Sequence, residues 1–404
     1  MTTPALSFRL IPMRARDPHE PGRVASTLEL FFDLVFVVAV SNAAVQLHHE
    51  LTEEHVGSGL VSYAMVFFAI WWAWMNFTWF ATSFATDDWL YRVVTIGQMA
   101  GVLILSAGIE PLFADRDFRV LVFAYVVMRM AMVAQWLRAS RRAGPLRRTA
   151  LTYAVGITVV QALWLASLAL SGTAAAVFVL FLILAELSVP IIAERRATTP
   201  SHPHHITERY GLFTLIVLGE TLLAAANAII EAVHDHEAVT PLVGLSMFTL
   251  VVTAGLWWIY FWPPHHAAIP TLAASFRYGY VHYLVFAAAG ALSAGVEVLI
   301  DVDTDHSKLD SRAAAFTVTV PIAVFVLSIW LIAIRAAADR LVNTVLPIGA
   351  VLVLLSPLVP YALAITAVVM ALMVAALVAS GAQQDLARPA GPGVRGVDRA
   401  DVLE

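Results

Sequence analysis

The sequence predicts an all-α polytopic membrane protein with about twelve transmembrane helices. Hydrophobic residues make up 60% of the 404 residues and charged residues only 13%, whereas about 25% of a soluble domain is charged. The mean hydropathy is +0.79. The apolar residues also fall into runs of about 20, the length that a helix needs to cross a bilayer. These observations together place the chain among membrane proteins.

Taken in order, the apolar runs predict twelve spans separated by short polar loops. They cover residues 27–47, 57–80, 89–110, 118–138, 149–170, 173–193, 208–230, 240–262, 276–300, 313–335, 341–356 and 358–379. The last two ranges allow a second interpretation, because Ser356 and Pro357 interrupt a continuous run. That stretch forms either two spans or one span and a re-entrant segment.

Both termini are predicted to be disordered tails. Residues 1–23 contain several prolines and four arginines. They lack the apolar core of a signal peptide, so we expect them to remain in the cytoplasm. Residues 381–404 are rich in glycine, proline and aspartate, a composition typical of disorder.

The arginines predict how the chain is oriented. Loops on the cytoplasmic side of a membrane protein carry an excess of basic residues. With the N-terminus in the cytoplasm, one basic residue, Arg129, lies within a span, and only four face outward: Arg116, Arg119, Lys308 and Arg312. The chain is therefore predicted to lie in the plasma membrane with both termini in the cytoplasm.

Two groups of tryptophans end predicted spans on this same side. They lie within residues 71–79 and 257–262. Tryptophan is enriched where the bilayer meets water, so both groups are expected near the cytoplasmic interface.

Similarity between the two halves predicts an internal duplication. LSAGIE at residues 105–110 is followed 187 residues later by LSAGVE at residues 292–297. Tryptophan pairs at residues 71–72 and 257–258 are separated by nearly the same interval. Chance similarity of apolar sequence is the alternative, but the common order and offset favour duplication. Six spans in each copy would make the copies, residues 24–200 and 201–380, run parallel.

Several functional classes are excluded by what the sequence lacks. The chain has no cysteine, which rules out disulfides and thiolate metal sites. It has no G-x-x-x-x-G-K-[ST] motif, so it carries no P-loop ATPase of its own. No catalytic nucleophile–base arrangement is recognisable. We therefore expect no enzyme activity, no cofactor and no nucleic-acid partner.

Ionisable residues within the predicted spans point to a functional polar layer. Glu29 and Asp33 are one helical turn apart and share a face. At 1.5 Å per residue, Asp33, Arg129, Glu186 and His282 lie about 9–13 Å from the cytoplasmic ends of their spans. A charge inside a bilayer costs at least about 2.5 kcal/mol, so these side chains should face other helices. We expect one network in which Asp33 pairs with Arg129.

Two roles fit such a network. A carboxyl group kept protonated beside a histidine is suited to a proton relay. Paired buried charges can instead hold helices in register without moving anything. The sequence leaves both interpretations open.

A second group of polar residues lies in the seventh span. Glu220 follows Gly219, and Asn227 shares a face with Glu220. The two side chains could contact an ion or substrate, or Glu220 could be a satisfied polar residue at a close helix contact made possible by Gly219. Glu208 and Arg209, at the start of the span, are expected to be solvated, although the match of Glu208 to Glu29 of the first half makes Glu208 a further candidate contact for an ion or substrate.

Histidines gather in three predicted loops but do not predict a metal site. None of the groups has the H-E-x-x-H spacing or another ordered ligand spacing. We expect solvated loop residues at His48, His49, His55, His202, His204, His205, His265 and His266.

Four sequence stretches resemble the bacterial low temperature requirement A family of multi-pass membrane proteins. They are ELFFDLVFV at residues 29–37, WWAWMNFTWFATSF with DDWLYR at residues 71–92, ERYGLFTLIVLGE at residues 208–220 and RYGYVHYL at residues 277–284. The resemblance covers roughly residues 24–380. It implies a multi-pass membrane fold, and it makes Glu29, Asp33, Glu208 and Glu220 the acids of the family motifs. The family name derives from a growth phenotype in the cold and implies no particular activity.

The sequence as a whole favours a secondary transporter or ion pathway, with proton coupling as one option. The expected partners are the lipid bilayer and an unidentified small solute or ion. The alternative is a membrane sensor or scaffold that transports nothing and in which the buried charges only clamp helices. Water should reach the buried acids in a pathway, whereas a clamp keeps them dry.

Overall fold

The computed structural model describes residues 10–234, 239–304 and 306–387 of the chain, and these residues form helices without strands. The first half contains α1 (Thr27–Thr52), α2 (Val56–Phe84), α3 (Trp89–Ala107), α4 (Ile109–Asp115), α5 (Arg119–Ser140), α6 (Arg147–Ser167) and α7 (Gly172–Glu194). The second half contains α8 (Pro203–His234), α9 (Val239–Phe261), α10 (Leu272–Asp303), α11 (Ser311–Ile329), α12 (Arg340–Leu355) and α13 (Ala362–Ala387). Short 3-10 turns lie at Gly144–Leu146, His265–Ala268 and Ser356–Leu358, and a π-helical turn extends α11 at Trp330–Ile334.

The predicted all-α polytopic class is confirmed. Twelve helices in the described chain are long and apolar enough to cross a membrane. The third of these spans consists of α3 and α4, which meet at Gly108. The last predicted pair consists of two separate helices, α12 and α13, because the turn Ser356–Leu358 reverses the chain between them. The interpretation with two spans is therefore correct, and the re-entrant one is wrong.

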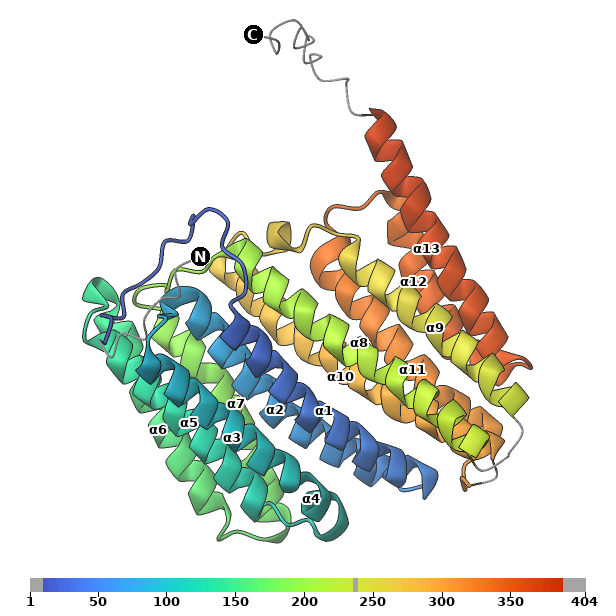
Figure 1. The fold of residues 1–404 in the computed structure, drawn as a ribbon, viewed down its shortest axis with the longest axis horizontal. Helices are drawn as coiled ribbons and strands as arrows, with labels where there is room; N and C mark the ends of the chain where they lie inside the picture. The colour runs from blue at the N-terminus through green and yellow to red at the C-terminus, as the bar shows by residue number, and fades with distance from the viewer. Residues whose placement is uncertain (1–9, 235–238, 305, 388–404) are drawn as a thin grey trace, which may run out of the picture.

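The helices pack in the same order in each half. When α3 and α4 are counted as one helix, the first helix of each half contacts the second and the third. The third helix contacts the fourth, the fourth contacts the fifth, and the fifth contacts the sixth. Figure 1 shows the first half, in blue and green, beside the second half, in yellow to red. The halves meet through α1 and α2 on one side and α8 and α10 on the other. This common order agrees with duplication, which stays a prediction.

The repeated LSAG sequence lies at a close helix crossing in both halves. A Cβ atom on Gly108 would lie 2.9 Å from the backbone nitrogen of Leu121 at the start of α5. A Cβ atom on Gly295, in α10, would lie 2.4 Å from the carbonyl oxygen of Thr317 in α11. Real Cβ atoms do not approach backbone so closely, so glycine is what allows these helix pairs to touch.

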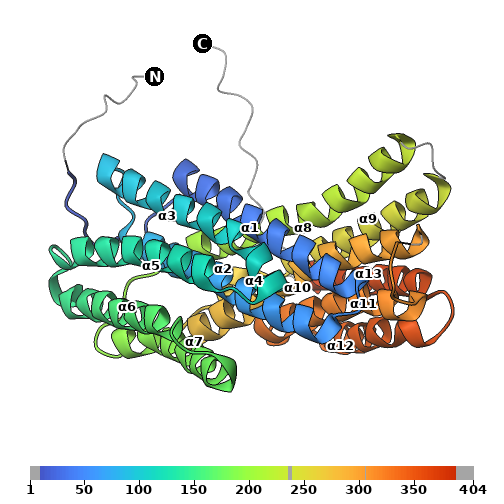
Figure 2. The ribbon, with the colours of Figure 1, turned by 90° about the horizontal axis from the view of Figure 1, so that it is seen from below.

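The bundle has two ends, which we call the N-terminal face and the opposite face. The N-terminal face is the end at which α1, α8 and α10 begin, and it lies uppermost in Figure 1. At the opposite face, α8 and α9 diverge from the remaining helices (Figure 2). The outer part of α8 is correspondingly exposed along one side, at Leu222, Leu223, Ile230 and Val233.

The expected N-terminal tail is wrong for residues 10–23, which lie against the N-terminal face. The backbone N–H of Ile11 donates to Asp88 at 2.9 Å. Arg23 donates to the carbonyl oxygen of Ala81, in the last turn of α2, at 3.0 Å, and the side chain of Met13 is buried. The composition predicts disorder, but the segment docks because its polar groups find partners at helix ends.

Asp88 fixes this segment to two helices. Its carboxylate accepts the backbone N–H of Tyr91 and so caps α3, and it also binds Ile11 and Arg138 of α5. Burial opposes ionisation of Asp88, but Arg138 and the two backbone N–H groups outweigh it and hold the pKa of the carboxyl group below its ordinary value.

The C-terminal helix is longer than expected. Residues 381–387 continue α13, although they were assigned to the C-terminal tail. Residues 1–9 and 388–404, which form the outer parts of the two predicted tails, lie outside the described residues.

Candidate functional site

A cluster of buried charges lies between α1 and α8, where the two halves meet. Arg209 donates to Asp33 at 2.5 and 3.0 Å and to Glu29 at 3.1 Å. Arg209 and Asp33 are fully buried, and Glu29 is nearly so. One guanidinium therefore serves two carboxylates, which offsets part of the desolvation cost of burying all three groups. This cluster joins a helix of the first half to a helix of the second.

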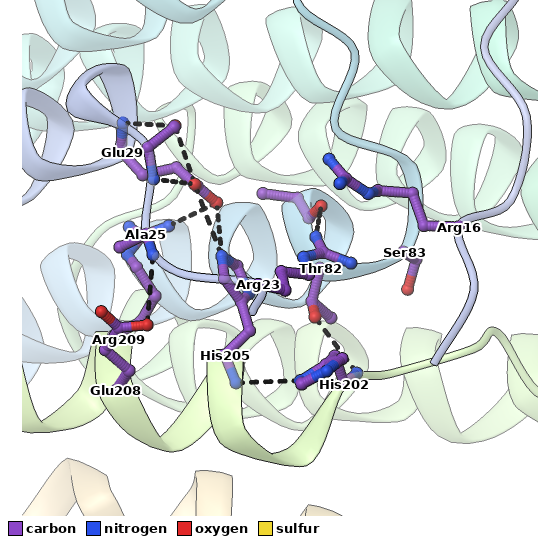
Figure 3. Close-up of polar contacts among 12 residues, drawn as sticks. Arg16, Arg23, Ala25, Glu29, Thr82, Ser83, His202, His205, Glu208 and Arg209 are labelled. Atoms are coloured by element: carbon purple, nitrogen blue, oxygen red, sulfur yellow. Dashed lines mark hydrogen bonds and ion pairs between the residues drawn. The ribbon is translucent and has the colours of Figure 1, made fainter. Parts of the chain in front are cut away.

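The local sequence positions Glu29 at the start of α1. Ser26 caps the helix, and its backbone N–H and hydroxyl donate to the Glu29 carboxylate, both at 2.8 Å, in a capping box. The same carboxylate lies 3.3 Å from Nε2 of His205, as Figure 3 shows. Glu208 accepts the backbone N–H of Ala25 at 3.1 Å. The first turns of α8 thus contact the first turn of α1 through several polar groups.

A second buried ion pair lies wholly within the first half. Arg129 of α5 donates to Glu186 of α7 at 2.9 Å, and both side chains are fully buried. Gln161 of α6 donates to the other Glu186 oxygen at 2.7 Å. The guanidinium also lies 5.9 Å from the ring of Tyr125. This pair holds three helices of the first half in register.

The predicted pairing of Asp33 with Arg129 is therefore wrong. Asp33 binds Arg209, and Arg129 binds Glu186. The rise per residue along a helix predicts how deep a side chain lies, but it does not predict which neighbouring helix the side chain faces. Depth alone therefore does not distinguish Arg129 from Arg209 as the partner of Asp33. Arg209 was expected to be solvated because it lies near the end of its span, yet it is fully buried beside α1 and the ring of Trp74.

Two tryptophans of α2 serve these ion pairs instead of lying at the membrane interface. Trp74 donates its indole N–H to Asp33 at 2.7 Å, and Trp72 donates to Glu186 at 2.9 Å. Residues two apart on a helix point about 200° apart, so the two indoles reach opposite sides of α2. The W-x-W spacing within an apolar helix was the signal that could have revealed this. Trp257 and Trp258 of α9, by contrast, are exposed.

His282 belongs to neither ion pair. Its Nδ1 donates to the carbonyl oxygen of Tyr278 at 2.7 Å, and its Nε2 lies 3.2 Å from the hydroxyl of Tyr260. The ring of Tyr210 packs edge-on at 4.7 Å. These contacts suit a neutral imidazole in the core of the second half. The five residues expected in one network therefore form three separate clusters.

Glu220 and Asn227, the two polar residues predicted to share a face in the second half of α8, differ in burial. Asn227 is exposed and Glu220 is half-buried. A Cβ atom on Gly219 would have nothing within 4 Å, so the alternative in which Gly219 allows a close helix contact is wrong. A role for Glu220 and Asn227 in contacting an ion or substrate stays a prediction.

Several loop histidines are buried, contrary to expectation. His202 donates to the carbonyl oxygen of Glu20 at 3.0 Å. His265 donates to the carbonyl oxygen of Tyr260 at 2.6 Å and accepts from Tyr278 at 2.9 Å. Burial lowers the pKa of His265 to about 4, although the bond to the carbonyl opposes this. Within the described ranges, no group of three or more potential ligands could hold a metal ion. The buried loop histidines are His202, His205 and His265, whereas His204 and His266 are exposed.

A further polar cluster joins α1 to α10 near the opposite face. His48 lies 2.7 Å from Asp301 and 3.3 Å from Glu297. Thr52 donates to the same oxygen of Asp301 at 3.2 Å. Together with the Arg209 cluster, this places polar contacts to the second half near both ends of α1.

A cavity of about 230 Å³ lies between the halves near the N-terminal face. Its walls come from α2, α5, α6 and α7 of the first half and from α10 and residues 269–272 of the second. Most of the lining is aromatic or aliphatic, and the polar side chains include Asn76, Glu194 and Ser275. Sequence reasoning missed Glu194, because an acid followed by two arginines at the end of an apolar run resembles an ordinary solvated helix end.

Two comparisons relate this chain to known proteins. The model of a family described as bacterial low temperature requirement A protein (LtrA) matches residues 24–380. The chain is also similar to RA0937 of Rhizobium meliloti (strain 1021), which is described as an uncharacterized protein, with 28% identity over 247 residues. That match covers 59% of this chain and 58% of the relative, so less than two thirds of the relative's length is spanned. The site residues described above all lie within the range matched by the family.

Proposed function

The chain belongs to the bacterial low temperature requirement A family, and we propose that this member is a secondary transporter whose substrate binds in the cavity between the two halves. The observation that carries the proposal is the position of that cavity, which is walled by helices of both halves. Carriers built from two similar halves bind their substrates at such an interface. On the distribution of basic residues, we place the protein in the plasma membrane with both termini in the cytoplasm.

The contacts of α1 support a mechanism of alternating access. The Arg209 cluster ties α1 to α8 near the N-terminal face, and the His48 cluster ties it to α10 near the opposite face. A carrier needs contacts between its halves on both sides of the substrate, so that one set opens while the other stays closed. The charged groups of both clusters can separate and reform without covalent change.

The buried acids have a different role here from the relay considered for the sequence. Asp33 and Glu186 each bind an arginine and an indole N–H, and both are fully buried. Each acid is thus held by donors on neighbouring helices, an arrangement that suits a clamp between helices.

The complete burial of Asp33 and Glu186 also favours a second candidate function, that of a membrane sensor or scaffold. In such a protein, the two ion pairs only clamp helices, and the cavity opens to one side alone. The two functions differ in whether the cavity becomes accessible from both sides of the membrane.

Single-cysteine labelling separates the two functions. The chain contains no cysteine, so a Ser275→Cys variant places one thiol in the cavity without background. A carrier should react with a membrane-impermeant thiol reagent from either side of sealed vesicles, because both conformations are visited. Reaction from one side only would contradict the transport proposal and favour the scaffold.

Two surface variants calibrate the labelling. Arg195 is exposed at the N-terminal face, and Ser171 is exposed at the opposite face. Arg195→Cys and Ser171→Cys should each react from one side only, and from different sides. These controls establish vesicle orientation and show that the reagent does not cross the bilayer.

A further inference from the structure

A single charged residue lines the cavity between the halves, and it is negative. Glu194, the last residue of α7, is the only aspartate, glutamate, lysine, arginine or histidine among the described lining residues. Its side chain is buried, with the residue 5% exposed. A buried carboxylate is unfavourable unless a cation or a proton neutralises it.

Hydrogen bonds position Glu194 without neutralising its charge. The hydroxyl of Tyr153 donates at 2.8 Å, and the backbone N–H and hydroxyl of Thr199 donate at 2.7 and 2.9 Å. All three donors are uncharged. In the described part of the chain, no arginine, lysine or histidine forms an ion pair with this carboxylate. A carboxylate offers about four lone-pair positions, so an acceptor position remains free for a ligand.

Aromatic rings form much of the rest of the wall. Trp79 and Phe80 come from α2, Trp136 from α5, and Phe276 and Tyr280 from α10. The face of an aromatic ring attracts a cation, and tryptophan does so most strongly. The ring of Trp136 stacks on that of the residue that donates to Glu194, Tyr153, with centroids 4.1 Å apart. The aromatic wall therefore contacts the tyrosine that donates a hydrogen bond to the Glu194 carboxylate.

We propose that this cavity binds a small organic cation, such as an amine or a quaternary ammonium ion, with Glu194 as its counter-ion. The carboxylate neutralises the charge, and the rings surround the apolar groups of the ligand. A cavity of about 230 Å³ accommodates a small molecule rather than a peptide or a whole lipid. The proposal names the substrate class of the transporter and in that respect rests on the proposed function.

The cation and a proton compete for Glu194. Tyr153 on α6 and Tyr280 on α10 are the titratable side chains that line the cavity with it, and neither supplies a positive charge. Arg195 and Arg196 follow Glu194 in the chain but are exposed. The residues of α2 and α5 that line the cavity include no titratable side chain. A proton can neutralise the carboxylate in place of the cation, so cation binding is expected to weaken as the pH falls.

Calorimetric titration of the purified protein in detergent tests the proposal. Benzyltrimethylammonium is the cationic probe, and benzenesulfonate is a control of similar size and opposite charge. The cation should bind saturably and the anion should not. Affinity for the cation should weaken by about tenfold or more between mildly alkaline and mildly acidic pH, because the proton competes.

Two variants test whether Glu194 is the residue that binds the cation. Glu194→Gln keeps the shape and an acceptor oxygen but removes the charge, so it should lose about tenfold or more in affinity along with the pH dependence. Glu110→Gln, which alters an exposed carboxylate of α4, should bind like the unmodified protein. Unchanged affinity in Glu194→Gln, equal binding of the anion, or no saturable binding of the cation by the unmodified protein would each overturn the proposal. The comparison of cation, anion and pH in the unmodified protein decides the matter even if Glu194→Gln does not fold.

The two proposals can fail separately. Cation binding without two-sided labelling of Ser275→Cys would overturn transport but leave the cation site intact. Two-sided labelling without cation binding would overturn the cation site alone.

Discussion

At the residue scale, Arg209 carries buried ionic contacts between the two halves. It lies beside Glu208, an acid of a family motif, yet the arginine is the residue that reaches Glu29 and Asp33. Sequence reasoning identified both acids and their shared helix face, because charges in an apolar run stand out. It could not identify the partner, because pairing depends on how each helix is rotated toward its neighbours.

Replacing Arg209 with methionine should destabilise the protein strongly. The change leaves two buried carboxylates without a cation, and breaking a buried pair in this way costs about 3–5 kcal/mol. Thermal unfolding in detergent measures the loss. Adding Glu29→Gln and Asp33→Asn should restore part of the stability, because the unpaired charges are removed.

The exposed arginine that follows α7 provides the control for this prediction. Arg195→Met removes a guanidinium of the same size from the surface and should leave the unfolding temperature unchanged. An Arg209→Met variant as stable as Arg195→Met would contradict the assigned role of the ion pair.

Burial of His265 predicts a stability that depends on pH. The ordinary pKa of histidine is 6.5, and that of His265 in the folded protein is about 4. Above pH 6.5 both folded and unfolded states are neutral at this position. As the pH falls from 6.5 toward 4, only the unfolded state takes up the proton, so the free energy of unfolding falls, by on the order of 3 kcal/mol.

Denaturation of the purified protein across this pH range tests the prediction. His265→Gln should flatten the slope, whereas His204→Gln, at an exposed position, should retain it. An identical slope in all three proteins would show that His265 does not cause the pH dependence.

At the scale of single elements, hydropathy predicted the helices well, because a run of about 20 apolar residues has few alternatives to a transmembrane helix. The N-terminal segment was predicted less well. Its docking depends on partners such as Asp88 and Ala81, which are distant in sequence and supply polar groups at helix ends. The tryptophans of α2 illustrate the same limit, because an apolar residue with one N–H group suits either the interface or a buried acid.

The glycines of the helices differ in their packing, which predicts opposite effects of alanine. Gly295→Ala places a methyl group against the carbonyl oxygen of Thr317 and should destabilise by roughly 1–3 kcal/mol. Gly219→Ala meets no atom within 4 Å and should be neutral or slightly stabilising, since alanine favours the helix by up to about 1 kcal/mol. Thermal unfolding of the two variants in detergent gives the comparison. Equal stability of the two would mean that α10 and α11 are not in backbone contact.

At the scale of the whole molecule, the repeated LSAG sequence and the spacing of the tryptophan pairs predict two similar halves, and this duplication stays a prediction. The interface between the halves could not be predicted from the sequence. A repeated sequence predicts that similar helices recur, but it does not predict which residues meet between the halves. Glu194 shows the consequence, because it becomes notable only once α10 and residues 269–272 enclose the space beside it.

The contacts of α1 determine which helices would have to move together if one half rotated against the other. Although α1 belongs to the first half by sequence, charged groups near its two ends contact α8 and α10, and the helix also packs on α2 and α3. Any rotation of one half against the other must either detach one end of α1 or carry the helix along with the second half. In the transport cycle that we propose, the hinge is therefore expected along the length of α1 and not at the loop that links α7 to α8.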